Sequence, residues 1–92
     1  AAKRYGQTQV YSSVERLHPH FLPKLRSIAP TVTRREELIA MLVALQVDRK
    51  QIESVMSMRR SKLAKTRYSL RRKIKLNPKD SLEYAINKIL NK

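Results

Sequence analysis

The chain has 92 residues, enough for one small domain, and a formal net charge of +14, which indicates an anionic partner. It contains no Cys, which excludes disulfides and thiolate metal sites and fits a reducing compartment such as the cytoplasm. The longest apolar run, from Leu38 to Leu45, has eight residues, far fewer than the roughly 20 that span a bilayer, so we expect no membrane contact.

The first third of the chain predicts two short helices separated by a proline. Apolar residues keep a helical spacing there, and Pro19 interrupts it. Because proline lacks an N–H and breaks a helix interior, we expect one helix at about 9 to 17 and a second at about 20 to 28. The residues that carry the spacing are Val10, Val14, Leu17, Phe21, Leu25 and Ile28.

Two histidines, His18 and His20, flank Pro19 and raise the question of a metal site. No Cys, no further His and no cluster of carboxylates stands near them in the sequence to complete a set of metal ligands. Two isolated histidines are far more often turn or surface residues. We therefore expect neither a metal ion nor another cofactor.

A capping box predicts the start of the next helix. In Thr33-Arg34-Arg35-Glu36, the Thr hydroxyl can accept from the backbone N–H three residues later, and Glu36 can reach back to the backbone N–H of the cap. The helix expected at about 34 to 46 is apolar nearly all round, so it belongs at the centre of the domain. Its apolar residues include Leu38, Ile39, Met41, Leu42, Val43 and Leu45.

A short helix and a tight turn follow. Asp48 is the N-cap candidate of a helix at about 48 to 56, and residues 57 to 59 leave room for a turn of three or four residues. A basic helix comes directly after that turn. Two helices joined in this way, the second of them basic, have the layout of a helix-turn-helix that reads DNA.

A last helix is expected after Asn77-Pro78, with a capping sequence at Asp80-Ser-Leu-Glu83. Its apolar stripe either packs inside the monomer or pairs two copies in a homodimer, and the sequence leaves both open. No segment alternates in the manner of a strand, so we predict an all-α fold, a small helical bundle. The stripe consists of Leu82, Ala85, Ile86, Ile89 and Leu90.

The segment from Arg59 to Lys75 is strongly basic, with nine Lys or Arg in seventeen residues and no Asp or Glu. A run of cations is often only a solvated face, but like charges along a helix repel, and no acid compensates them here. We therefore expect a helix at about 60 to 74 that lies against nucleic acid. Its narrow seam is Leu63, the stem of Arg67, Leu70 and Ile74, and its opposite side is Ser61, Lys65, Tyr68, Ser69 and Arg72.

The run Val-Thr-Arg-Arg-Glu at 32 to 36 resembles the Leu-Thr-x-x-Glu entry of LuxR/NarL-type DNA-binding domains. Residues 66 to 74, Thr-Arg-Tyr-Ser-Leu-Arg-Arg-Lys-Ile, resemble a subgroup that forms the C-terminal output domain of bacterial hybrid two-component or sensor-linked transcriptional regulators. The resemblance implies a helix-turn-helix without a wing that binds double-stranded DNA sequence-specifically in the bacterial cytoplasm. We accordingly divide the chain into an N-terminal helical extension or linker, 1 to 30, and a DNA-binding domain, 31 to 92.

The resemblance also implies contacts for single residues. It assigns base-edge contacts to Ala64, Lys65 and Tyr68, and phosphate contacts to Arg49, Lys50, Lys62, Ser69 and Arg72. We also expect Arg60 and Ser61, at the start of the basic helix, to contact DNA. Lys65 is the strongest candidate, because Lys in the major groove can donate to guanine acceptors. For Tyr68, packing of the ring on the domain surface is an equally good interpretation. Homodimerisation through the last helix is implied as well.

One ion pair is predicted from the seam of the basic helix. Because Arg67 lies near that seam, we predict that it pairs with Glu36 and fastens the central helix to the basic helix. The alternative is that Glu36 only completes its capping box. The resemblance departs at Glu53, which stands where the family usually has a small residue between the two reading helices.

Three other classes of function remain open. A helical protein that binds RNA or the ribosome would share the charge but show no preference for duplex DNA. A protein-interaction module would use the apolar last helix and be insensitive to Lys65. An enzyme is not expected, because the sequence shows no nucleophile with a paired base, no carboxylate cluster and no glycine-rich phosphate loop.

Overall fold

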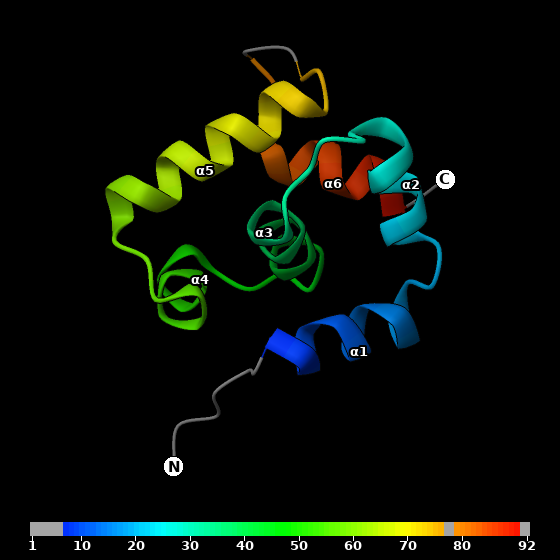
Figure 1. The fold of residues 1–92 in the computed structure, drawn as a ribbon, viewed down its shortest axis with the longest axis horizontal. Helices are drawn as coiled ribbons and strands as arrows, with labels where there is room; N and C mark the ends of the chain where they lie inside the picture. The colour runs from blue at the N-terminus through cyan, green and yellow to red at the C-terminus, as the bar shows by residue number, and fades with distance from the viewer. Residues whose placement is uncertain (1–6, 77–78, 91–92) are drawn as a thin grey trace.

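A computed structural model describes residues 7–76 and 79–90 of the chain, and within these ranges it consists of six helices and no strand (Figure 1). The all-α prediction is therefore confirmed, and the five helices for which bounds were predicted begin and end within two residues of them. The helices are α1 (Gln7–Leu17), α2 (Phe21–Ile28), α3 (Arg34–Ala44), α4 (Arg49–Met56), α5 (Arg60–Lys73) and α6 (Leu82–Leu90).

Helix α3 is the centre of the fold. The backbone N–H of Glu36 donates to Thr33 Oγ1 at 3.2 Å, and the N–H of Thr33 donates to Glu36 Oε1 at 2.8 Å, so the predicted capping box is formed. Every residue from 36 to 44 is buried. Because α3 is apolar on all sides, its neighbours α1, α4, α5 and α6 pack around it (Figure 1).

The hydrophobic core does not stop at the boundary predicted after residue 30. Val10 and Val14 of α1 and Phe21 and Leu25 of α2 are buried in the same cluster as the apolar residues of α3, α5 and α6. Helix α1 covers part of α3, and α2 packs against α1 and α6, so both N-terminal helices complete the core.

Glu37 of α3 fastens the N-terminal helices to the centre. Arg26 donates to its carboxylate from Nε at 2.6 Å and from Nη2 at 3.2 Å, and the Tyr11 hydroxyl donates to Oε1 at 3.0 Å. The hydrogen bond from Arg26 is the main reason that the pKa of Glu37 lies below its usual value, and it outweighs the opposing effect of burial. One carboxylate thus joins α1, α2 and α3.

Three helices end in the same left-handed turn without a glycine. Gln46, Ser57 and Lys75 have φ of 62°, 53° and 58° after α3, α4 and α5, respectively. In each case the next backbone N–H reaches five residues back, at 3.0 Å from Val47 to Leu42, 2.9 Å from Met58 to Glu53 and 3.1 Å from Leu76 to Arg71. This is the Schellman pattern, which satisfies the last carbonyls of a helix. The predicted turn between α4 and α5 forms in this way.

The start of α6 differs from the expected cap. Ser81 Oγ accepts from the backbone N–H of Tyr84 at 3.0 Å, so Ser81 takes the place expected for Asp80. Because Ser81 is the cap, Glu83 stands two residues after it and not the three that a capping box requires, and its carboxylate pairs with Arg67. The apolar stripe of α6 packs inside the monomer, since Leu82, Ala85, Ile86 and Ile89 are buried.

Candidate nucleic-acid interface

Helix α5 turns its seam inward, and four of its cations, Arg60, Lys62, Lys65 and Arg72, are exposed. Leu63, Arg67 and Leu70 are its buried residues, as the helical spacing predicts. The opposite side is open to solvent, which is the condition for contact with a partner. The predicted DNA contacts that are exposed are Arg49, Lys50, Arg60, Ser61, Lys62, Ala64, Lys65, Tyr68 and Arg72.

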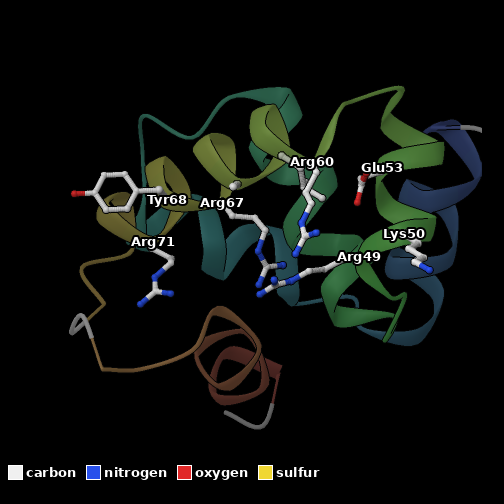
Figure 2. Close-up of a pocket in the computed structure, with 9 residues that line it drawn as sticks. Arg49, Lys50, Glu53, Arg60, Arg67, Tyr68 and Arg71 are labelled. Atoms are coloured by element: carbon white, nitrogen blue, oxygen red, sulfur yellow. The ribbon is translucent and has the colours of Figure 1, made fainter.

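A basic cleft lies along one flank of α5, against α4 (Figure 2). We call it the α4–α5 cleft; its volume is about 640 Å³. Glu53 is the one acidic residue in its described lining, where it faces five cations. The lining is Arg49, Lys50, Glu53, Arg60, Leu63, Ala64, Arg67, Tyr68 and Arg71.

A second basic hollow lies on another flank of α5, against the first turn of α3. We call it the α3–α5 groove; its volume is about 600 Å³. Lys62 and Lys65 line it from α5, and Arg34 and Arg35 line it from α3. Sequence reasoning did not select Arg34 and Arg35. Two cations at the positively charged start of a helix are unfavourable, and that signal marks them as candidates for anion contact.

The predicted ion pair between Glu36 and Arg67 is wrong. Glu36 Oε1 accepts from Lys73 Nζ at 2.6 Å, and Glu36 Oε2 accepts from the Ser69 hydroxyl at 2.7 Å. Ser69 and Lys73 lie one turn apart on the flank of α5 that faces the first turn of α3, whereas Arg67 projects toward α6. Arg67 Nη2 donates to both carboxylate oxygens of Glu83, at 3.1 and 2.8 Å.

The carboxylate of Glu36 has three hydrogen-bond partners, one in the cap of α3 and two on α5. Burial disfavours its ionised carboxyl, but hydrogen bonds from Lys73, from the Thr33 backbone and from Ser69 outweigh burial and lower the pKa of Glu36 below its usual value. The carboxylate caps α3 and anchors α5 through two residues. Ser69, which was expected to face outward and hold a phosphate, is therefore half-buried and engaged within the monomer.

Tyr68 is largely exposed on α5. Its residue is 63% exposed, and the Arg72 guanidinium carbon lies 6.0 Å from the centre of its ring. Tyr68 also lines the α4–α5 cleft, so both interpretations of this ring stay predictions. An exposed ring beside a guanidinium presents a flat, partly cationic surface to a partner.

The starts of α4 and α5 concentrate positive charge. Arg49 and Lys50 open α4, where Asp48 is the N-cap and accepts from the backbone N–H of Gln51 at 2.8 Å, and Arg60 and Lys62 stand in the first turn of α5, which has no side-chain cap. Helix N-termini already carry partial positive charge, so the uncapped start of α5 favours an anion through both its side chains and its backbone N–H groups.

The described residues contain no group of three or more His, Cys, Asp or Glu side chains that could hold a metal ion. His20 is exposed and His18 is half-buried, at the turn before α2. Among the described helices, none is long and apolar enough to cross a membrane.

No protein-family model, curated protein or solved structure matches this chain. The choice among functions therefore depends on the geometry and charge of α3, α4 and α5.

Proposed function

We propose that this chain binds double-stranded DNA, with α5 in the major groove, as the output domain of a bacterial transcriptional regulator in the cytoplasm. The observation that carries the proposal is the exposed cationic ridge of α5 between two basic hollows. A helix that enters the major groove has a phosphate backbone on each side of it. The α4–α5 cleft and the α3–α5 groove lie on the two flanks where those backbones would run.

Each part of this surface has a role in the proposal. Lys65 and Tyr68 are exposed on α5 and would contact base edges, with Ala64 beside them. The rims of the two hollows would hold phosphates and fix the register of α5 in the groove. These rim residues are Arg34, Arg35, Arg49, Lys50, Arg60 and Lys62.

A homodimer, if it forms on a palindromic site, uses a surface other than the predicted stripe of α6. Leu82, Ala85, Ile86 and Ile89 are already buried in the monomer. Tyr84, 49% exposed on α6, is available for such a contact.

Lys65→Glu and Lys88→Glu make the decisive comparison. Both reverse one exposed lysine, but Lys65 lies on α5 and Lys88 on α6. We expect Lys65→Glu to weaken binding to duplex DNA at least about tenfold and Lys88→Glu to weaken it less than about threefold. Fluorescence anisotropy at physiological salt measures both. Equal losses would indicate a diffuse charge effect and contradict the proposal.

Competition with RNA separates the proposal from its alternative. We expect unlabelled duplex DNA to displace a labelled duplex more effectively than RNA of the same sequence does, because A-form RNA has a deep, narrow major groove that α5 cannot enter. Stronger displacement by RNA would favour an RNA-binding protein. Selection of bound sequences from random duplex DNA then tests whether the binding is sequence-specific.

A further inference from the structure

Arg67 is a buried arginine whose guanidinium has one terminal nitrogen, Nη1, without a partner. Its side chain is 9% exposed, and it lines the α4–α5 cleft. Nη2 donates to Glu83, but Nη1 is buried and finds no hydrogen-bond partner among the described residues. An unpaired buried donor costs roughly 1–3 kcal/mol, and more when it is charged, so the site is incomplete as it stands.

The surroundings of Arg67 hold more positive than negative charge. Glu83 is the carboxylate bonded to Arg67, and burial opposes its ionisation, but the hydrogen bonds from Arg67 and from its own backbone and the charges of Arg67 and Arg49 lower the pKa of Glu83. Arg49 and Arg67 thus lie near the same carboxylate. None of the ion pairs within residues 7–76 and 79–90 involves Arg49, Lys50 or Arg60.

Figure 2 shows Arg60 and Arg67 projecting from α5 to the side on which Arg49 lies, at the start of α4. A guanidinium presents N–H groups in a planar fork that matches the oxygens of a phosphate. Three such forks line one opening: Arg67 has Nη1 unpaired, and no ion pair among the described residues involves Arg49 or Arg60, so together they are suited to a single phosphate group. Glu53 and Glu83 leave the cations in excess.

We propose that the α4–α5 cleft seats one backbone phosphate of the bound DNA, with Arg67 donating from Nη1 and Arg49 and Arg60 closing over the anion. This rests on the proposed function and adds a buried residue to the DNA contacts. Because less than 1 Å² of Nη1 is exposed, the side chains that cover it have to move before a phosphate can reach it. Glu83 holds Arg67 in place and competes with the phosphate for it.

Arg67→Gln and Glu83→Gln test this proposal as a matched pair. Both remove the same ion pair, so a purely structural role of Arg67 predicts the same effect for both. A phosphate contact predicts opposite effects. We expect Arg67→Gln to weaken duplex binding about tenfold and to reduce the slope of log K against log salt by roughly 0.9. We expect Glu83→Gln to tighten binding about twofold to threefold and to leave the slope unchanged.

Control variants separate charge and folding from the phosphate contact. Glu15→Gln removes one acid from the exposed surface of α1, so its effect on binding measures net charge alone. Far-UV circular dichroism monitors folding, and Arg67→Lys replaces Arg67→Gln if the latter does not fold. The lysine keeps the charge but loses the fork, so we expect it to keep the salt slope and lose part of the affinity. Equal losses in Arg67→Gln and Glu83→Gln, or an unchanged slope in Arg67→Gln, would overturn the proposal.

Inorganic phosphate distinguishes this failure from a failure of the proposed function. At ionic strength matched with chloride, we expect phosphate to raise the melting temperature of the wild type more than that of Arg67→Gln. If phosphate stabilises the wild type more than Arg67→Gln, but the wild type does not bind duplex DNA, the anion site stands and DNA is excluded as the source of the phosphate. If the wild type binds DNA, but phosphate stabilises it no more than Arg67→Gln and Arg67→Gln leaves the salt slope unchanged, the proposed phosphate contact is wrong and DNA binding stands.

Discussion

Neighbouring carboxylates of α3 determine how the other helices attach. Glu36 accepts from Ser69 and Lys73 of α5, and Glu37 accepts from Tyr11 of α1 and Arg26 of α2. Both carboxyls have a lowered pKa, because their hydrogen-bond partners favour the ionised form. Each of these contacts joins two side chains, so a substitution of one residue can test it.

A double-mutant cycle tests the anchor of α5. The side chains of Glu36 and Lys73 are 4% and 25% exposed, so solvent screens their ion pair only in part. We expect Glu36→Gln and Lys73→Met to show a coupling energy of about 1 kcal/mol in urea unfolding. The cycle between Glu36 and Arg67 is the control, and we expect a coupling near zero. The reverse order would contradict the observed pairing.

Acid sensitivity tests the contact at Glu37. The pKa of Glu37 in the folded state is below its value in the unfolded chain, about 4.3. The carboxylate therefore stabilises the fold fully at a pH above the unfolded-state pKa, and this contribution is lost as the pH falls through the folded-state pKa. Glu37→Gln should therefore melt at a lower temperature near neutral pH and lose less stability than the wild type during acidification. Arg26→Met, which removes the main donor, should shift the melting curve in the same direction. Parallel curves for wild type and Glu37→Gln would rule out this role.

At the level of helices, local signals in the sequence are more accurate than long-range partners, although Ser81 and not Asp80 caps α6. Thr33 and Asp48 cap α3 and α4 as predicted, because a cap joins residues that are three apart. Arg67 was assigned the wrong acid, because the direction in which a side chain leaves α5 depends on how α5 packs against α3 and α6. The unpaired Nη1 of Arg67 and the position of Arg34 and Arg35 beside α5 also depend on how the helices pack. The sequence alone therefore did not indicate that they belong to the candidate site.

The glycine-free helix ends make a prediction for α3. Gln46 has φ of 62°, a conformation that costs a residue with a Cβ about 1–2 kcal/mol and glycine almost nothing. We expect Gln46→Gly to stabilise the fold by roughly 0.5–1 kcal/mol after the greater chain entropy of glycine is subtracted. Gln46→Ala, which keeps the Cβ, is the matched control and should not stabilise. Urea unfolding of both variants measures the difference.

For the whole molecule, the shared core predicts that residues 31–92 do not fold well alone. Deleting residues 1–30 removes Val10, Val14, Phe21 and Leu25 and exposes the side of α3 that α1 covers. We expect the fragment to lose its cooperative thermal transition or to melt at a much lower temperature, as followed by circular dichroism. A peptide of residues 1–30 added in trans should restore part of the helicity. A fragment as stable as the full chain would show that the N-terminal helices are dispensable.

The adjacency of Glu36 and Glu37 has a mechanical consequence. Glu37 is bonded to the N-terminal helices and Glu36 to α5, so a single peptide bond separates the two points of attachment. A tilt of α1 or α2 that pulls on Glu37 would load the first turn of α3, where Arg34 and Arg35 stand, and through Glu36 would load Ser69 and Lys73 of α5. The two neighbouring carboxylates thus give a short covalent connection between the N-terminal helices and α5.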